Sequence, residues 1–372
     1  MRFHTDRTTT IGSICDVFDG PHATPKKTAE GPIYLGINAI TEEGHIDSSQ
    51  YAHLSEVDYT KWTRRIEPRP GDLVFSYEAA LGRYAIIPEG FRGALGRRLA
   101  LLRPKNEKTN IQWLLYYFLS PTWKAFTERE TVKGSTVNRL SVEEFPNYPV
   151  PLLSKESQDD IVSILAPIDK AISTNSQIND NLLEMAHAVY MHLFFRRTPN
   201  AKLGEILIEH PKSTVQVGDA KGVKGRFPFF TSGDSILRWN EPMVCGRFCL
   251  LNTGGNADVK FYAGEAAYST DTWCISAKEN MTDYLYMLLH TIQRELDQKF
   301  FTGTGLKHLQ KPLLKERPIY KPNLSEIEEF NELAVPTLTQ ISENLQENNV
   351  LTGLRDWLLP MLMNGQATIR PL

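Results

Sequence analysis

The chain has 372 residues, of which 41% are hydrophobic and 23% are charged, and its formal net charge at pH 7 is −3. These values are close to the average of globular proteins, which excludes disordered and fibrous classes, and the length predicts two or three domains. No apolar run approaches the roughly 18 residues of a membrane-spanning helix, and the first residues lack the apolar core of a signal peptide. We therefore expect a cytoplasmic protein.

Charge is unevenly distributed along the chain. Residues 151–197 and 323–372 carry more acidic than basic groups, whereas residues 1–150 and 198–322 carry a small excess of basic groups. Lys and Arg supply the affinity of proteins for phosphates, so the weakly basic segments are compatible with nucleic acid and the acidic segments favour protein partners. Ordinary surface variation explains imbalances of this size equally well.

The first 150 residues mix short strands with a late helix. Gly and Pro residues bound two strand-like runs, GDLVFSY at 71–77 and RYAIIPEG at 83–90. The run WLLYYFLSPTWKAF at 113–126 carries a large apolar face and predicts a helix.

The residues from 161 to 193 predict a long helix. Apolar residues recur there in two heptad series that are four positions apart, which is the pattern of a coiled-coil seam. Asn175 and Asn179 interrupt this seam. Pro167, and Pro336 in a second such segment, are expected to start or kink the straight part of each helix, because proline cannot donate to the preceding turn.

The second weakly basic segment repeats the mixture of strands and helix. The runs RFCLLN at 247–252 and VKFYAG at 259–264 predict strands, and DYLYMLLHTIQREL at 283–296 predicts a helix. The loops between such strands are able to present polar side chains to a ligand.

Residues 330–362 repeat the heptad pattern, less regularly because Thr337 and Arg355 occupy seam positions, and Asn344 and Asn348 interrupt the seam. A buried Asn costs stability unless it is hydrogen-bonded, and its best-attested use is to fix the register of a coiled coil. We predict that the two helices pack antiparallel, with all four asparagines at the same height and hydrogen-bonded across the seam. The alternative is that each helix packs on its own domain with its asparagines at the solvent edge.

The chain contains an internal duplication with an offset of 169 residues. The segment KGSTVNRL at 133–140 corresponds to TGTGLKHL at 302–309, and the helical segments 166–193 and 335–362 share eight identical positions. We predict an α+β fold in which two mixed domains alternate with two long helices that form an antiparallel coiled coil, related by a pseudo-two-fold axis. The expected boundaries are 1–153 and 198–322 for the domains, and 154–197 and 323–372 for the helices.

Two short motifs suggest catalysis. FTGTG at 301–305 matches a cofactor loop of amino-methyltransferases, but such a loop needs a buried strand before it and a helix after it. Asp234, Asp258 and Lys260 loosely fit a metal-dependent nuclease motif that is too short to be distinctive. The four cysteines lack metal-ligand spacing, and we expect buried, reduced thiols. We therefore expect neither a catalytic centre nor a metal site in this chain.

Six segments of the first domain form a recognisable set, which is GPHATP at 20–25, GDLVFS at 71–76, AIIPEGF at 85–91, LLYYFLSP at 114–121, KGSTVNRLS at 133–141 and NYPVPL at 147–152. Together with the helical segments 160–194 and 344–369, this set resembles the specificity (S) subunit of type I restriction-modification enzymes. The resemblance covers nearly the whole chain.

The resemblance implies that each globular domain is a target-recognition domain that reads one half of a bipartite site in double-stranded DNA. The helices would set the spacing of the half-sites and dock two modification (methyltransferase) subunits, which supply S-adenosylmethionine and methylate adenine. Restriction subunits would add ATP-driven translocation and cleavage, with Mg²⁺. The chain itself would be non-catalytic and would hold no cofactor. A self-sufficient nuclease or methyltransferase, and a scaffold that binds only protein, are the alternatives.

Phosphates are contacted by Lys, Arg, Ser, Thr and Asn, and base edges are read by Arg, Lys, Asn and Gln. Residues of these types in the expected loops are our candidates for DNA contact. In the first domain they are Lys26, Lys27, Arg64, Arg65, Arg83, Arg97, Arg98, Lys133, Ser135, Thr136, Asn138 and Arg139. In the second domain they are Lys221, Lys224, Arg226, Arg238, Asn252, Asn256, Thr304, Lys307, His308 and Lys311. The groups that flank the matched glycines, 133–139 and 304–311, are the strongest because both copies are polar and basic.

Overall fold

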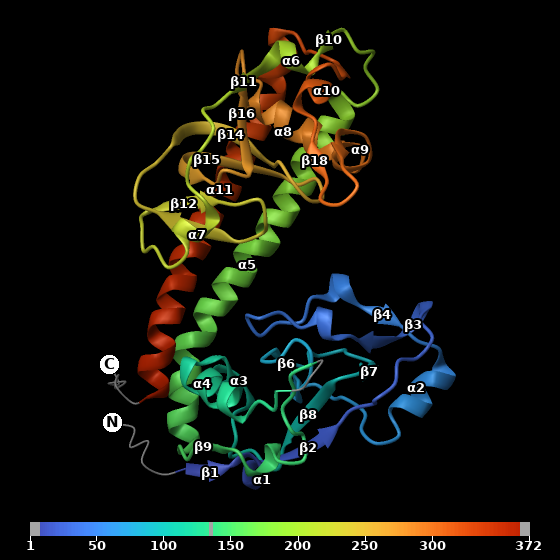
Figure 1. Cartoon of the computed structure of the whole chain (residues 1–372), viewed down its shortest axis with the longest axis vertical. Helices are drawn as coiled ribbons and strands as arrows, with labels where there is room; N and C mark the ends of the chain where they lie inside the picture. Colours follow the sequence, from blue (N-terminus) through green and yellow to red (C-terminus); the bar gives the residue numbers. More distant parts are fainter. Residues whose placement is uncertain (1–7, 134–136, 365–372) are drawn as a thin grey trace. The chain divides into compact units, whose positions relative to one another are not determined.

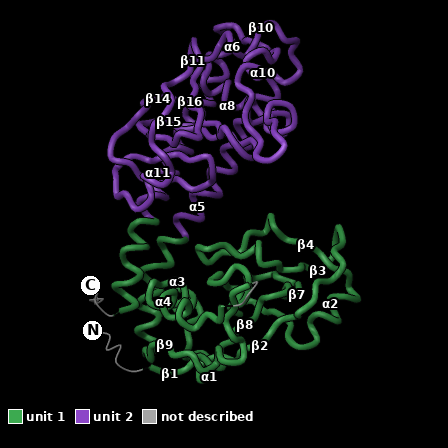
Figure 2. Tube along the Cα trace, viewed as in Figure 1, with its two compact units in different colours: residues 1–169, 352–372 green, residues 170–351 purple. Residues whose placement is uncertain are grey.

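The structure of the protein is a computed structural model, and it describes residues 8–133 and 137–364. The chain forms two compact units (Figure 2). The first unit comprises residues 1–169 and 352–372, and the second comprises residues 170–351. Each of the two long helices therefore contributes residues to both units.

The first unit is built on a four-stranded antiparallel sheet with the order β2-β8-β5-β6. Its strands are β2 (Cys15–Asp19), β5 (Leu73–Ser76), β6 (Tyr84–Ile86) and β8 (Leu99–Pro104). A second sheet has the order β4-β3-β7, with β3 and β7 parallel, and consists of β3 (Thr28–Leu35), β4 (Ala52–His53) and β7 (Gly93–Leu95). A separate pair joins β1 (Thr8–Thr10) to β9 (Pro149–Pro151). The strands predicted near residues 71–77 and 83–90 are confirmed as β5 and β6.

The helices of the first unit are mostly short. They are α1 (Ile11–Ile14), η1 (Ile37–Ala39), η2 (Ser48–Gln50), α2 (Glu56–Trp62), α3 (Ile111–Leu119), α4 (Pro121–Glu130) and η3 (Phe145–Asn147). The prediction of one helix over 113–126 is wrong, because the chain turns at Ser120. The Ser120 hydroxyl accepts a hydrogen bond from the backbone N–H of Trp123 at 3.3 Å, and Pro121 occupies the first turn of α4, where its missing N–H costs nothing.

An aromatic cluster fills the first unit. Trp113, Trp123, Tyr84, Phe118 and Phe145 are each at most 1% exposed. The indole Nε1 of Trp123 donates to the hydroxyl of Tyr84 at 2.8 Å, and the rings of Phe118 and Trp123 stack with centres 4.5 Å apart. The only polar group of the Trp123 side chain is thus satisfied, so the whole ring is buried without an unpaired donor.

The second unit is built on a six-stranded sheet with the order β11-β16-β14-β15-β12-β13. Its strands are β11 (Leu207–Glu209), β12 (Phe227–Phe230), β13 (Ile236–Trp239), β14 (Val244–Asn252), β15 (Val259–Tyr268) and β16 (Thr272–Ala277). Two short pairs join β10 (Ala201–Lys202) to β19 (Pro318–Ile319) and β17 (Phe301–Thr302) to β18 (His308–Leu309). The predicted strands 247–252 and 259–264 are confirmed as parts of β14 and β15.

The short helices of the second unit are α6 (Leu203–Ile206), α7 (Val217–Ala220), α8 (Thr282–Thr291), α9 (Gln293–Glu295), the π-helix η4 (Leu296–Phe300) and α10 (Lys311–Lys315). The helix predicted over 283–296 is therefore interrupted after Thr291. Asp283 of α8 is 1% exposed and accepts a hydrogen bond from Arg247 Nε of β14 at 2.7 Å. Arg247 Nη1 also donates to Thr339 at 2.7 Å, so one arginine joins sheet, helix and the second long helix.

The long helices are α5 (Lys155–Leu193) and α11 (Leu324–Met363), drawn in green and red in Figure 1. Their first residues differ by the same 169 positions as the sequence duplication. Pro167 and Pro336 do not start the helices, because both lie well inside them, so of the two expected roles, starting or kinking the straight part, the first is excluded. Ile161 and Leu165 of the preceding turns are fully buried, and this packing holds the helix together where proline removes one backbone hydrogen bond.

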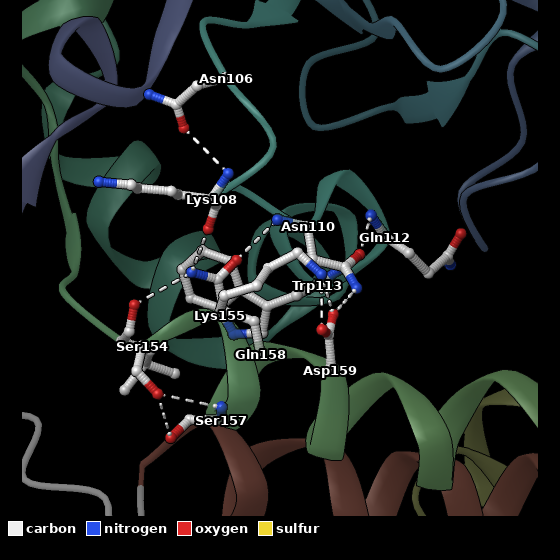
Figure 3. A network of polar contacts seen from close by, with 11 residues as sticks. Asn106, Lys108, Asn110, Gln112, Trp113, Ser154, Lys155, Ser157, Gln158 and Asp159 are labelled. Carbon is white, nitrogen blue, oxygen red and sulfur yellow. Dashed lines mark hydrogen bonds and ion pairs between the residues drawn. The ribbon is translucent and has the colours of Figure 1, made fainter.

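A polar network fixes the first turns of α5 to the start of α3 (Figure 3). Gln158 is 5% exposed; its Oε1 accepts from the backbone N–H of Asn110 at 2.7 Å, and its Nε2 donates to the carbonyls of Lys108 and Leu153. Asn110 Nδ2 donates to Asp159 at 2.6 Å. Because each buried polar group of Gln158 has a partner, the junction between the first sheet domain and α5 is ordered rather than a loose linker.

The asparagine prediction is confirmed within the second unit. Asn175 Nδ2 donates to Asn348 Oδ1 at 3.0 Å, and Asn344 Nδ2 donates to Asn179 Oδ1 at 2.7 Å. Adding the offset of the duplication to Asn175, and subtracting it from Asn348, converts the first bond into the second. The helices therefore pair antiparallel about a pseudo-two-fold axis that passes between these bonds, and the alternative with separately packed helices is wrong. The α+β class and the duplicated order of domain and helix are confirmed as well.

Candidate nucleic-acid interface

Four segments of the first unit meet at one end of the four-stranded sheet, and we call them the first loop cluster. They are the opening turn after β2 (residues 19–25), the loop after β5 (77–83), the turn before β8 (96–98) and the described residues of the segment 132–140, which are 132–133 and 137–140. The backbone N–H of Leu140 donates to the carbonyl of Tyr77 at 2.8 Å, and the N–H of Tyr77 donates to that of Arg98 at 3.2 Å. Backbone hydrogen bonds thus join three of these four segments.

The opening turn is shaped by a glycine and by a hydrogen bond between two of its side chains. A Cβ on Gly20 would stand 2.1 Å from the carbonyl oxygen of Leu99, and the N–H of Gly20 donates to that same oxygen at 3.1 Å. Only glycine allows this approach of two backbones. His22 Nε2 lies 2.7 Å from Asp19 Oδ2, and His22 Nδ1 lies 3.4 Å from the Tyr77 hydroxyl. The turn is therefore tied to the loop after β5.

Basic candidates gather around this cluster. Arg98 pairs with Glu78 at 2.9 Å, and Glu78 in turn forms a backbone bridge with Arg139. Lys27 Nζ lies 5.9 Å from the ring centre of Tyr34, whose hydroxyl accepts from the backbone N–H of Arg97 at 3.2 Å. The exposed candidates of the cluster are Arg97, Lys133, Asn138 and Arg139, and the exposed Lys26 and Lys27 directly follow its opening turn, whereas Ser135 and Thr136 lie outside the residues that the structure describes.

A cavity of about 430 Å³, which we call the first turn cavity, opens beside the opening turn. Its wall includes the end of α2 and the residues after it, namely Lys61, Trp62, Arg64, Arg65 and Ile66. Lys61 Nζ lies 4.9 Å from the ring centre of Trp62, which is the arrangement of a cation–π contact. The structure thus brings the candidates Arg64 and Arg65 next to the opening turn.

Two candidates have structural roles. Arg83 Nη1 donates to the carbonyls of Ile37 and Ile40 at 3.3 and 3.1 Å, so its guanidinium holds a neighbouring loop. Asn252 is 5% exposed, and its Nδ2 donates to the carbonyls of Gly254 and Asn256. The selection of Asn252 for DNA contact is corrected accordingly, because its buried amide is used up within its own loop.

The second unit repeats the arrangement, and we call these segments the second loop cluster. They are the opening turn after β11 (209–213), the loop after β14 (252–258) and the β17–β18 hairpin with its connection (301–309). The N–H of Leu309 donates to the carbonyl of Thr253 at 3.0 Å, and the N–H of Gly255 donates to that of Lys307 at 2.9 Å. Leu309 corresponds to Leu140 under the duplication, and each follows the matched glycine, Gly134 or Gly303, in what we call the glycine segment. The same backbone hydrogen bond therefore joins the glycine segment to the loop after the central strand, β5 or β14, in both units.

The candidates of the glycine hairpin reach the surface. Thr304 and His308 are exposed, and the exposed Asn256 lies in the loop that the hairpin contacts. Lys307 is half-buried, with its Nζ 2.8 Å from Asp297 Oδ2. The ammonium of Lys307 therefore has one anionic partner before any DNA binds.

A second cavity of about 380 Å³, the second turn cavity, lies beside the opening turn of this unit. Lys212, Lys311, Trp273 and Thr253 are part of its wall. Lys311 Nζ lies 4.8 Å from the ring centre of Trp273. Burial, together with the nearby Lys212 and Lys315, lowers the pKa of Lys311, although Glu209 opposes the shift.

The other candidates of this domain lie elsewhere. Lys221, Lys224, Arg226 and Arg238 surround β12 and β13, whereas the opening turn follows β11 at the opposite edge of the six-stranded sheet. They therefore do not belong to the second loop cluster.

The catalytic motifs do not form sites. FTGTG lies in the β17–β18 hairpin and follows a π-helix, so it lacks the strand and helix of a methyltransferase cofactor loop. Lys260 pairs with Asp258 at 2.8 Å and donates to the carbonyls of Thr231 and Gly233, which are structural contacts. Among the described residues, no group of three or more His, Cys, Asp or Glu side chains is placed to hold a metal ion.

The cysteines differ from expectation at one position. Cys15, Cys249 and Cys274 are buried, but Cys245 of β14 is exposed. Burial raises the pKa of Cys15 and of Cys274 to about 12, so these thiols stay protonated at neutral pH and are poor nucleophiles.

Sequence analysis missed His22, Lys61, Trp62 and Lys212. Two signals for them were present in the sequence. The run KWTRR at 61–65 combines basic residues with an aromatic residue, and the similar turns DGPH at 19–22 and EHPK at 209–212 each combine a proline with a basic residue. Their meaning depends on the cavity that they line, which the sequence does not indicate.

Comparison with known proteins identifies relatives of the whole chain. Residues 8–184 match the family described as the type I restriction modification DNA specificity domain. The specificity subunit of the type I restriction enzyme MjaIX from Methanocaldococcus jannaschii is 20% identical over 366 residues, which cover 86% of this chain and 83% of that protein. The crystal structure of the S subunit of a type I restriction-modification system from M. genitalium shares the fold with a TM-score of 0.58 and 14% identity, over 96% of this chain and 95% of that chain.

Two sheet domains with matching loop clusters, alternating with two long helices, define a protein with a duplicated recognition domain. Residues 8–184 belong to the family of type I restriction modification DNA specificity domains, and the chain as a whole is similar to a specificity subunit of such an enzyme. The resemblance found in the sequence is thereby confirmed. None of the helices in the described part of the chain is both long and apolar enough to cross a membrane.

Proposed function

We propose that the chain is the non-catalytic DNA-recognition subunit of a type I restriction-modification complex, in which each unit reads one half of a bipartite site in double-stranded DNA. The observation that carries this proposal is the duplicated loop cluster. The hydrogen bond from Leu140 to Tyr77 recurs as the bond from Leu309 to Thr253, and basic side chains surround both. Two copies of one reading surface fit a target with two halves.

The long helices complete the proposal. They set the separation of the two half-sites, and their pseudo-two-fold arrangement offers similar surfaces to two modification subunits. Those partners supply S-adenosylmethionine and methylate adenine, and restriction subunits bring ATP, Mg²⁺ and cleavage. The domain boundaries that we propose are 1–153, 154–197, 198–322 and 323–372, and a DNA substrate places the complex in the cytoplasm.

Mapping methylated adenines in cells that carry this chain and its modification partner tests the proposal. We expect one bipartite sequence with a spacer of fixed length. The purified chain alone, incubated with DNA, Mg²⁺ and S-adenosylmethionine, should leave the DNA uncut and unmethylated; activity of the chain alone would establish the enzyme alternative. Failure of the chain with its partner to retain any duplex at low salt would establish the scaffold alternative.

Charge removal at the glycine segments tests the two reading surfaces. We expect Arg139→Ala and Lys307→Ala each to weaken binding and to reduce the slope of log affinity against log salt by about one unit, because each loses one contact to DNA. Binding titrations between 50 and 200 mM salt measure the slope. Unchanged slopes would remove both residues from the interface.

A further inference from the structure

We propose that the two turn cavities are backbone grips, each of which binds one phosphodiester group of the DNA independently of the base sequence. The proposal rests on the function proposed above, and it assigns different tasks to neighbouring parts of each loop cluster. The cavities fix the position of the duplex, and the glycine segments beside them are left to read it. Phosphate contacts of this kind orient a protein on DNA without carrying sequence information.

Both cavities occupy the same place in the fold. Each lies beside the turn that follows an edge strand, which is β2 in the first unit and β11 in the second. In each turn an acidic residue is followed, two positions later, by a proline and then by a basic side chain, as in Asp19-Gly20-Pro21-His22 and Glu209-His210-Pro211-Lys212. The duplication has therefore kept the cavity, although the residues of the turn have changed.

A lysine on a tryptophan ring stands in the wall of each cavity. Lys61 lies 4.9 Å from the ring centre of Trp62, and Lys311 lies 4.8 Å from that of Trp273. These pairs come from different elements, since Lys61 belongs to α2 whereas Lys311 belongs to α10. The same lysine–tryptophan contact is thus formed in both cavities by residues from non-equivalent elements. A ring contact positions an ammonium and leaves its N–H groups free to donate to an anion.

The acid of each turn already has a hydrogen-bond partner. Asp19 pairs with His22 at 2.7 Å, and Glu209 pairs with Lys315 and accepts from the indole N–H of Trp273 at 2.9 Å. In the first turn cavity, Lys61, Arg64 and Arg65 form no ion pair with a carboxylate among the described residues, and the same holds for Lys212 and Lys311 in the second. Clustered cations without counter-charges favour a bound anion.

The two grips differ in strength. The wall of the first cavity holds three basic side chains, Lys61, Arg64 and Arg65, and one carboxylate, Asp19, which is hydrogen-bonded to His22. The wall of the second also holds the exposed Asp271, which opposes an anion. The lowered pKa of Lys311 reflects burial among other lysines, and a phosphate would compensate that charge. We therefore expect the first cavity to hold its phosphate more tightly than the second.

The test uses the full chain purified with its modification partner, and duplexes that contain either the mapped site or a scrambled site. Lys61→Ala and Lys311→Ala should each reduce the salt slope by about 0.9, which is the value for one phosphate contact. Between 50 and 200 mM salt, the loss of affinity should then be about threefold smaller for each variant than for the wild type. The double variant should lose both contributions, and the preference for the mapped site over the scrambled site should be unchanged.

Matched controls are exposed lysines outside the cavities, Lys124 of α4 and Lys278 beyond the far end of β16. Their alanine variants should retain the wild-type slope. Lys61→Arg and Lys311→Arg should also retain it, because they keep the charge. Because Lys61 is exposed and Lys311 is half-buried, thermal unfolding should show the fold of each variant intact.

Duplexes with single neutral methylphosphonates locate the contacted groups. One position in each half of the site should weaken wild-type binding and should have no further effect on the variant of the corresponding cavity. Wild-type slopes in both alanine variants, or a loss of preference for the mapped site, would overturn the proposal while leaving the recognition function standing. Failure of the wild-type complex to bind any duplex would overturn the recognition function, and this proposal with it.

Discussion

At the scale of single residues, the second unit holds a pair of histidines away from the loop clusters. His290 of α8 and His187 of α5 lie edge to face with ring centres 5.8 Å apart, and Tyr286 packs against His290. Burial lowers the pKa of His290 below its ordinary value of 6.5, and His187 adds to this shift, although Asp258 opposes it. The unfolded chain therefore binds the proton more readily than the folded chain does.

The pH dependence of stability follows from this difference. Because the pKa of His290 is lower in the folded state, His290 should not change the free energy of unfolding with pH above about pH 7. As the pH falls below 6.5, protonation of His290 in the unfolded chain should destabilise the second unit. The slope from one proton is at most about 1.4 kcal/mol per pH unit. His290→Phe, which keeps an aromatic ring, should remove that part of the slope in thermal unfolding at pH 5.5 and 7.5. Burial also lowers the pKa of His210, so the part of the slope that comes from His210 should remain in this variant. Equal slopes in the variant and the wild type would contradict the assignment.

The candidate site could be predicted only in part from single residues. Residue type and duplication selected Asn138, Arg139, Thr304 and His308, whose side chains are exposed, because polarity and repetition are properties of the sequence. Asn252 was misjudged because burial of its amide depends on the turn that closes around it, with Gly254 and Asn256 as acceptors. Lys61 and His22 were missed because their neighbourhood is created by the sheet, which brings residues 40 positions apart to one cavity.

At the scale of elements, periodicity determined what could be predicted. The long helices and the asparagine contacts followed from heptad spacing, which sets the facing side chains almost without regard to the rest of the fold. The break at Ser120 was missed because apolar residues continue through it, and the local capping by Ser120 and Pro121 outweighs that continuity. Arg355, an irregular seam residue, is 15% exposed and donates to Asp169 at 3.2 Å, so its charge has a partner within the helix pair.

The paired asparagines predict a coupling between the helices. Asn344→Leu removes the donor to Asn179 Oδ1 and leaves a half-buried acceptor unpaired, which should lower the free energy of unfolding of the second unit by about 1–3 kcal/mol. Replacing Asn179 and Asn344 together should cost clearly less than the sum of the single changes. Urea unfolding of the four proteins of this cycle measures the coupling, and the pair of Asn175 and Asn348 offers a matched cycle. Strict additivity would show that the amide contact does not hold the register.

At the scale of the whole molecule, the first unit is discontinuous in sequence. Its core includes Leu359, Leu362 and Met363 near the end of α11, together with Ile161 and Leu165 of α5. The first sheet domain alone therefore does not complete the unit; the residues after 351 are needed as well. Sequence duplication predicted the alternation of domains and helices, but this closure could not be predicted, because it depends on which residues of the antiparallel helix come level with the first domain.

Leu362 gives the sharpest test of this closure. The side chain is 2% exposed in the core of the first unit, so Leu362→Ala should destabilise that unit by about 2–5 kcal/mol through lost burial and a residual cavity. Hydrogen exchange resolved along the chain should then show faster exchange in α3 and β5, although these elements lie more than 200 positions earlier in the sequence, and unchanged exchange in β14 and β15. Leu354→Ala is the matched control, since Leu354 lies two turns earlier on the same helix and is 42% exposed. If Leu362→Ala instead accelerated exchange in both units equally, the two units would unfold together, and the end of α11 would stabilise the chain as one cooperative body.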